Sequence, residues 1–336
     1  MIEYFSKPKF PPKYLNYSSF LLCRPGKSYK INANVCIIKN NKPILFDVGL
    51  DWNMLFNLQK AIKIIGKNPK DVIFAVVSHT HPDHFLNLLS IRRFFPNIKI
   101  IIHRETYESF MNVLKMDKNK IFRQKSSYNK IFDLYLRFLE KLEGFYVLQK
   151  NKIYMVNQDC YIPHINIKLK IIHTPGHSAG HICLQDCTNK ILFLGDHLPF
   201  TPWLDISEDS IDNMIYSINK LLKISSKEVK YSVRGHGNLS DNSREVYPWD
   251  VEKERFRAHL DLIEESIEII PKIIKKRAMT IEQIAFRVLK NKDFLEYSSL
   301  MTKFFIPPNL TWIICYLLKL EKEQKVRCEA NKWISI

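Results

Sequence analysis

The segment Ser-His-Thr-His-Pro-Asp-His at residues 78–84 constrains this chain more than any other part of its sequence. It follows the apolar run 71–77, which has the composition of a buried strand. The segment is therefore expected to form a tight loop at a strand end. Several metal-competent side chains cannot be buried there without a shared partner, and a metal ion is the usual one. The motif predicts a metal site with four ligands from this loop: His79, His81, Asp83 and His84.

Three further candidate ligands each follow a strand-like run, and a glycine precedes each of them. Glycine permits tight turns and close backbone approach at strand ends. Ligands on several strand ends can meet at one edge of a sheet. The combination of imidazole and carboxylate ligands suits zinc, although iron and manganese also accept it. The expected metal centre is therefore completed by His177, Asp196 and His236.

The first hundred residues predict alternating strands and helices around this motif. Two β-rich runs within residues 31–47 are separated by Asn40-Asn41, which indicates a hairpin. Apolar residues at helical spacing, ending at Gly66, indicate a helix over 52–66. A strand over 71–79, a short helix over 85–95 and a strand over 97–105 complete a β-α-β-α-β order. Apolar strands in this order predict an α/β fold whose sheets are covered by helices.

Two segments depart from this pattern. Residues of about 106–144 have helical periodicity and interrupt the strand series, as either a lid that shapes the substrate site or an insertion that only packs. From Pro248 onward the sequence indicates three helices, one with a Thr280–Gln283 capping box, and a terminal hairpin. We therefore expect a main domain over 1–247 and a winged-helix-like domain over 248–336. The tail could instead simply pack against the main domain or against a second subunit.

Composition restricts the function less than the motifs do. The net charge of +17 would favour polyanionic partners, but lysines are spread along the chain, which indicates a compositional bias on solvated surfaces. The seven cysteines form no CxxC pair, so neither a disulfide framework nor a cysteine zinc site is expected. No apolar run is long enough to span a membrane, and no signal peptide is evident at the start. The expected location is cytoplasmic, and the oligomeric state stays open.

The segments SHTHPDH, TPGHSAGH, LFLGDH and RGHG, in this order, resemble the metallo-β-lactamase superfamily over about residues 18–245. The resemblance implies a four-layer αββα sandwich with two metal ions at one edge of the sheets. It implies that His79, His81 and His177 hold one ion. It also implies that Asp83, His84 and His236 hold the second, with Asp196 bridging the two.

The resemblance also implies a binuclear hydrolase, with two Zn²⁺ and a metal-bridging hydroxide as nucleophile. Asp83 is the candidate to relay the proton. The segment TPGHSAGHICL is especially similar to glyoxalase II-like thioester hydrolases, so the first expectation for the substrate is a small acyl thioester or related ester. The tail instead resembles the branch that includes the mitochondrial β-lactamase-like endoribonuclease, so RNA is an alternative substrate. A third alternative is a non-catalytic nucleic-acid-binding protein.

Other residues near the motifs have weaker assignments. Asp47 could orient a ligand histidine through a hydrogen bond or could serve only as a turn residue. His181 and His197 are expected beside the ligands or in the pocket wall, and Trp203 in the pocket wall or in packing. The remaining histidines considered are expected to be ordinary ones: His103, His164, His173 and His259.

Overall fold

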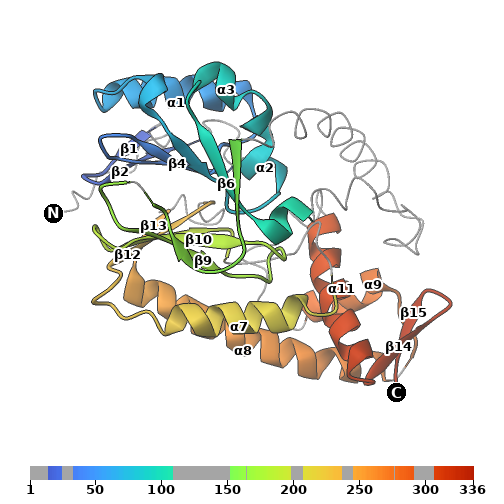
Figure 1. Cartoon of the computed structure of the whole chain (residues 1–336). Helices are drawn as coiled ribbons and strands as arrows, with labels where there is room; N and C mark the ends of the chain where they lie inside the picture. The colour runs from blue at the N-terminus through green and yellow to red at the C-terminus, as the bar shows by residue number, and fades with distance from the viewer. Residues whose placement is uncertain are drawn as a thin grey trace.

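Two β-sheets pack face to face and helices cover the outer face of each (Figure 1). The computed structural model describes residues 14–24, 33–108, 152–163, 165–197, 207–236, 245–275, 277–290 and 306–336. Helices α1 (Trp52–Ile64) and α3 (Ile91–Phe94) lie over the first sheet. Helices α7 (Ser210–Leu222) and α8 (Trp249–Ile274) lie under the second. The layer order is therefore αββα, which confirms the predicted fold class.

The first sheet contains strands from the N-terminal half of the chain. Its pairing is antiparallel from β1 to β4 and parallel from β4 to β7. The predicted hairpin within 31–47 is confirmed as the antiparallel pair β3–β4. The strand order is β1 (Tyr14–Asn16), β2 (Phe20–Cys23), β3 (Val35–Ile38), β4 (Ile44–Phe46), β5 (Phe74–Val76), β6 (Lys99–His103) and β7 (Ile153–Val156).

The second sheet contains the later strands. Its neighbours pair antiparallel except β11 and β12, which run parallel. Because these two strands are parallel, their carboxyl ends lie at the same edge of the sheet. The strand order is β13 (Val246–Pro248), β12 (Tyr231–Arg234), β11 (Ile191–Gly195), β10 (Ile182–Asp186), β9 (Leu169–His173) and β8 (Cys160–Tyr161).

Helix α1 has the ends that the sequence predicts. The Asp51 side chain accepts a hydrogen bond from the Met54 amide at 2.9 Å, which caps the amino end. Gly66 has a φ of 71° just beyond the carboxyl end, and its amide donates to the Lys63 carbonyl at 3.0 Å. Glycine adopts this left-handed conformation at little cost, which explains why the helix stops there.

The helix after the metal motif begins earlier than predicted. Helix α2 (Pro82–Phe85) starts inside the motif and leads through a 3₁₀ turn, η3 (Leu86–Leu89), into α3. The expectation that Asp83 and His84 lie in a loop, with a helix beginning at residue 85, is therefore wrong. Proline is favoured in the first turn of a helix because its fixed φ suits that position and its missing N–H is not needed there.

The C-terminal region is helical and ends in a hairpin. Helices α9 (Ile281–Lys290) and α11 (Ile306–Lys322) follow α8, and β14 (Val326–Glu329) pairs antiparallel with β15 (Lys332–Ser335). The predicted capping box is confirmed, since the Thr280 amide donates to Gln283 Oε1 at 3.1 Å and the Gln283 amide to Thr280 Oγ1 at 3.4 Å. The winged-helix assignment and the domain boundary at 247/248 stay predictions.

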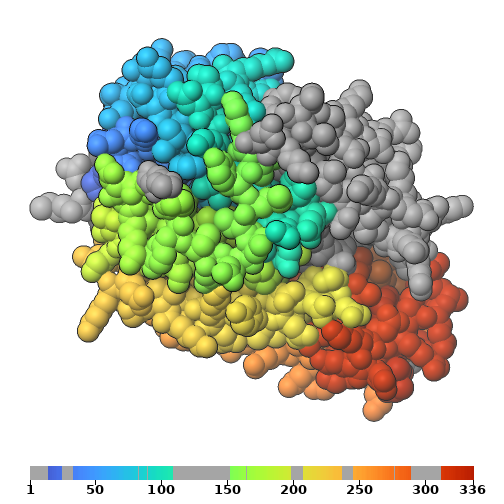
Figure 2. Space-filling view, in the orientation of Figure 1, coloured from blue at the N-terminus to red at the C-terminus, as the bar shows by residue number. Residues whose placement is uncertain are grey.

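One hydrophobic core joins the second sheet to this region. Leu194 of the sheet, Trp249 of α8 and Tyr316 of α11 belong to the same cluster of buried side chains. Helix α11 packs against α7, where Lys319 Nζ is 2.6 Å from Asp212 Oδ1. In the space-filling view, the C-terminal residues in red border the segment in yellow that contains α7 (Figure 2). Most of the predicted insertion, residues 109–144, and Trp203 lie outside the described residues. Among the helices that the structure describes, none is long and apolar enough to cross a membrane.

Candidate metal centre

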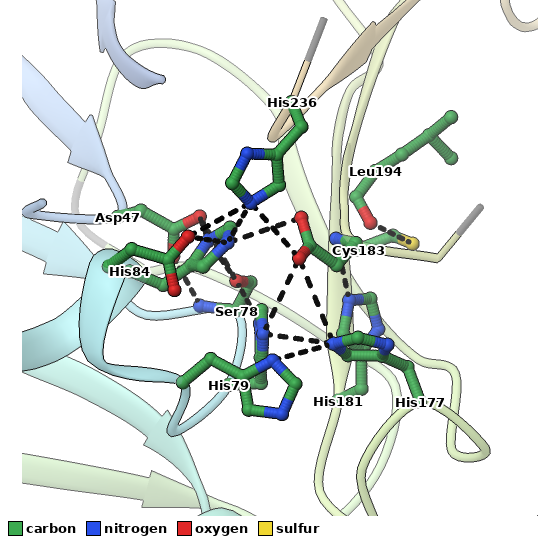
Figure 3. A network of polar contacts seen from close by, with 12 residues as sticks. Asp47, Ser78, His79, His84, His177, His181, Cys183, Leu194 and His236 are labelled. Carbon is green, nitrogen blue, oxygen red and sulfur yellow. Dashed lines mark hydrogen bonds and ion pairs between the residues drawn. The ribbon is translucent and has the colours of Figure 1, made fainter. Parts of the chain in front are cut away.

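The seven predicted ligands meet at one edge of the two sheets, as Figure 3 shows for several of them. Each half of the chain supplies part of the set. The first sheet provides the segment after β5, including the first turn of α2. The second sheet provides the turn after β9 and the residues that directly follow β11 and β12. The structure therefore brings together all of the residues predicted for the centre: His79, His81, Asp83, His84, His177, Asp196 and His236.

Three histidines form one group of possible donors. His177 Nε2 lies 3.2 Å from His79 Nε2 and 3.0 Å from His81 Nδ1, and all three side chains are buried. The Asp196 carboxylate faces the same group, with Oδ2 at 3.9 Å from His79 Nε2 and 3.8 Å from His177 Nε2. Three ring nitrogens and one carboxylate oxygen thus point toward a common space.

A second group lies on the other side of Asp196. His236 Nε2 is 2.9 Å from Asp83 Oδ2, and His84 Nε2 is 3.6 Å from the same oxygen. Asp196 Oδ1 lies 3.1 Å from His84 Nε2, and Asp196 Oδ2 lies 3.3 Å from His236 Nε2. The Asp196 carboxylate therefore contacts both groups.

Asp47 lies outside both donor groups and forms hydrogen bonds with Ser78 and His84. Its Oδ1 accepts a hydrogen bond from the Ser78 amide at 2.8 Å, and its Oδ2 accepts from Ser78 Oγ at 3.0 Å and from His84 Nδ1 at 2.7 Å. The Asp47 backbone has a φ of 63°, a conformation that aspartate tolerates better than most residues. The hydrogen bond to Nδ1 leaves His84 Nε2 as the nitrogen that faces the centre. Of the two roles considered for Asp47, the structure shows the orienting contact.

Ser78 is a supporting residue that sequence reasoning missed. Its hydroxyl lies 2.8 Å from His79 Nδ1, and this contact turns His79 Nε2 toward the other ligands. The only signal available in the sequence is its place directly before His79. Hydroxyl groups are common at strand ends, so that place does not distinguish a supporting serine from any other.

The two histidines next to the predicted ligands differ in their contacts. His181 Nδ1 lies 2.9 Å from Thr174 Oγ1, and His181 Nε2 accepts a hydrogen bond from the Asp196 amide at 3.3 Å. His181 therefore supports the backbone of Asp196. His197 is buried, and its ring centroid lies 5.7 Å from that of Phe256 on α8 and 5.7 Å from that of His181.

The two donor groups differ in electrostatics. Burial first, and the neighbouring histidines second, hold the pKa of His79 well below its usual value, so this ring is neutral at neutral pH. Burial alone would also lower the pKa of His84 and His236. The carboxylates around them outweigh that effect, raising the pKa of His84 well above its usual value and that of His236 to about 10. The negatively charged carboxylates around the second group therefore favour binding of a cation there.

The donor set fits transition-metal ions. Lone pairs on converging ring nitrogens repel one another unless a cation lies between them, and imidazole with carboxylate is a ligand set that zinc, iron and manganese accept. At Gly235 the lack of a side chain also lets the backbone lie close to Asp196 and His84. A Cβ added there would lie 2.5 Å from Asp196 Oδ1 and 2.7 Å from His84 Cε1.

Another histidine pair lies at the ends of β6 and β9. The rings of His103 and His173 stack with centroids 3.9 Å apart, and Glu105 Oε2 is 3.4 Å from His173 Nε2. His103 Nδ1 accepts from the Glu105 amide at 3.3 Å, and His173 Nε2 lies 2.9 Å from the Ala179 carbonyl oxygen. His103, Glu105 and His173 also lie close enough together to hold a metal ion, so the expectation that both histidines are ordinary ones stays a prediction.

Comparison with known proteins identifies the family. The sequence profile described as "Metallo-beta-lactamase superfamily" matches residues 30–255. The chain therefore belongs to the metallo-beta-lactamase superfamily, as its motifs predicted.

Particular relatives match only part of the chain. A hydroxyacylglutathione hydrolase from Pelagibacter ubique is 31% identical over 115 residues, which is 33% of this chain and 47% of the relative. The acyl-coenzyme A thioesterase MBLAC2 of Gallus gallus is 34% identical over 76 residues, 21% of this chain and 27% of that protein. The chain thus spans less than half the length of these relatives.

Solved structures match over nearly the whole chain. A metallo-beta-lactamase family protein from Thermus thermophilus has a TM-score of 0.66 at 13% identity, covering 95% of this chain and 99% of that one. A beta-lactamase domain protein from Burkholderia ambifaria has a TM-score of 0.68 at 12% identity, covering 98% and 95%. At these identities the likeness establishes the fold.

Proposed function

We propose that this chain is a two-metal hydrolase, with zinc as its metal, that cleaves a small acyl thioester or a related ester. The observation that carries the proposal is the position of the Asp196 carboxylate between two groups of three donors. The substrate class is supported by two partly similar proteins, whose names denote a hydrolase of hydroxyacylglutathione and an acyl-coenzyme A thioesterase.

The two donor groups divide the ligands. One ion would be held by His79, His81 and His177 and the other by Asp83, His84 and His236, with Asp196 contacting both. When bound, the ions supply Lewis acidity and a water nucleophile that is active at neutral pH. The chain itself needs no serine or cysteine nucleophile for this chemistry.

Asp83 is the proposed proton relay. Burial would raise its pKa, but His84 and His236 hold that pKa below its usual value, so the carboxylate is ionised and can accept a proton. The Asp83 side chain is 16% exposed, and its Oδ2 lies 2.9 Å from His236 Nε2. Asp47 and Ser78 orient the ring nitrogens of His84 and His79 and take no proton in this scheme.

The first prediction concerns the ligands themselves. We expect Asp83→Ala and His84→Ala to lose bound metal and hydrolysis together, because each removes a donor from the same group. Elemental analysis, circular dichroism and a thioester assay on the purified variants check this, and Asp51→Ala, at the cap of α1, is the control. A wild-type protein without a transition metal would overturn the proposal.

RNA is the second candidate substrate. The described helices α8, α9 and α11 precede the hairpin β14–β15, an order compatible with the winged-helix unit predicted from the sequence, and the net charge of +17 favours a polyanion. Metal-loaded protein should therefore be assayed against a panel of acyl thioesters and against single-stranded RNA. RNA cleavage that Asp83→Ala abolishes, together with no thioester turnover, would replace the first candidate with the second.

A further inference from the structure

A buried ion pair joins helix α8 to the end of strand β12, two residues before His236. Arg234 is the last residue of β12, and its Nε and Nη2 both donate to Glu252 Oε1, at 2.9 and 2.6 Å. Both residues are buried, Arg234 at 6% and Glu252 at 0% exposure. The cost of removing such charges from water can exceed the gain from their attraction, so the pair is a poor source of stability. Its geometry therefore calls for another explanation.

Further contacts hold the Arg234 guanidinium in one orientation. It lies 4.9 Å from the centroid of the Tyr247 ring, and Arg255 of α8 lies 3.8 Å from the same centroid. Arg255 Nη1 is also 3.8 Å from Glu252 Oε2. Glu252 thus faces two arginines that both contact one aromatic ring, and this leaves the Arg234 side chain little freedom to move.

The backbone beside Arg234 leads directly to the metal centre. The Arg234 amide donates to the Glu245 carbonyl at 2.9 Å, and the Gly235 amide donates to the Gly195 carbonyl at 2.8 Å, next to Asp196. His236 follows, and its side chain is 33% exposed, whereas that of His84 is fully buried. Packing around the His236 ring is therefore weaker, and its position depends more on how the backbone before it is held.

We propose that Glu252 is a positioning residue that, through Arg234, fixes His236 against Asp83 and Asp196. Helix α8 thereby sets the metal affinity of the Asp83–His84–His236 group, while the three-histidine group is independent of it. This inference rests on the two-metal centre proposed above. It assigns the C-terminal region a role in assembling that centre.

The test is Glu252→Gln, which keeps the shape of the side chain and removes its charge. We expect affinity for the Zn²⁺ equivalent held by the Asp83–His84–His236 group, called the second equivalent below whatever the order of binding, to fall by about tenfold or more. This is the range seen when a residue that orients a ligand is lost, and the equivalent held by the three histidines should be unchanged. Competition with a chromophoric chelator measures both affinities. The absorption spectrum of the Co²⁺-substituted protein reports on the geometry of the second site independently of activity.

Two control variants lie on the same helix. Glu254→Gln removes an exposed carboxylate that pairs with Arg257 and should leave both affinities unchanged. Ile263→Ala truncates a buried core residue and should lower the melting temperature without a selective loss at the second site. If Glu252→Gln and Ile263→Ala weaken both equivalents equally, general destabilisation explains the result and the positioning role is wrong.

If Glu252→Gln does not fold, a double variant still tests the proposal. It replaces both members of the ion pair, so the Arg234 charge is not left buried without its partner. Glu252→Gln with Arg234→Met should fold and still bind the second equivalent weakly. If the wild-type protein binds two equivalents of Zn²⁺ and the variants bind both as tightly as the wild type, the positioning role is wrong and the two-metal centre is unaffected. Wild-type protein that binds fewer than two would overturn the two-metal centre itself.

Discussion

The Asp47 side chain shows how one residue outside the candidate ligand set can orient several candidate ligands. Its two oxygens accept three hydrogen bonds, from the amide and hydroxyl of Ser78 and from His84 Nδ1. Ser78 in turn contacts His79, so a single carboxylate is linked to one histidine of each donor group. Such contacts fix the ring orientation and raise the basicity of the ligand nitrogen.

We expect Asp47→Asn to lower metal affinity by roughly 10- to 100-fold, because the amide cannot reproduce all three acceptor contacts. Chelator competition measures the change. Asp51→Asn, which alters the cap of α1 and none of these contacts, is the matched control. Unchanged affinity in Asp47→Asn would show that the turn role alone accounts for this residue.

We expect Gly235→Ala to displace Asp196 or His84, since the added Cβ would lie 2.5 Å from Asp196 Oδ1. Metal content should fall while the circular dichroism spectrum stays that of the wild type. The matched control is Gly66→Ala. Nothing lies within 4 Å of a Cβ there, but φ is 71°, so this variant should lose roughly 1 kcal/mol of stability and keep its metal. A fully metallated Gly235→Ala protein would contradict the expectation.

The sequence predicts the candidate ligands better than the residues that support them. A cluster such as His79, His81, Asp83 and His84 is unusual enough to stand out, and the structure brings it together with the later candidates. The contacts of Ser78 and Thr174 depend on which strands lie beside one another. Because serine and threonine are common and their partners are distant in sequence, no local pattern identifies them.

Among the elements, the buried helices and central strands are the ones that sequence predicts. The apolar spacing of α1 and the runs of β5, β6 and β11 are local signals. The short outer strands β1 and β8 were not predicted, because two or three residues carry too little pattern and the pairing partner fixes the strand. The early start of α2 was missed for the same reason, since a single helical turn has no periodicity.

Helix α8 gives a prediction about pH and stability. Burial lowers the pKa of His259 to about 4, whereas an unfolded histidine titrates near ~6.5. Between these values the unfolded chain binds more protons, so stability is complete above the unfolded pKa and falls as the pH drops toward 4. The loss should approach ~3 kcal/mol. Urea unfolding of chelator-treated protein should show this slope, and His259→Gln should reduce it. Equal slopes in the wild type and in His259→Gln would contradict the attribution of this pH dependence to His259.

At the scale of the whole molecule, the continuous core between the second sheet and the C-terminal region governs unfolding. Leu194, Trp249 and Tyr316 share it, so we expect one cooperative transition for the metal-free protein in scanning calorimetry. The change to a helical texture after Pro248 predicts a domain boundary, but a local pattern cannot reveal a shared core. Two well-separated transitions would show that 248–336 folds independently.

The division of the ligands between the two sheets has a consequence for synthesis. Each donor group combines residues from the segment after β5 with a histidine from the second sheet, His177 in one group and His236 in the other. A nascent chain that ends before His236 lacks part of the second group, however much of the first sheet has folded. Loading of the ion proposed for the Asp83–His84–His236 group would therefore be a late event, and a truncated product would be left with an incomplete set of candidate ligands. Tight binding of both proposed ions would then report that the chain has been translated beyond β12 and that its two halves have joined.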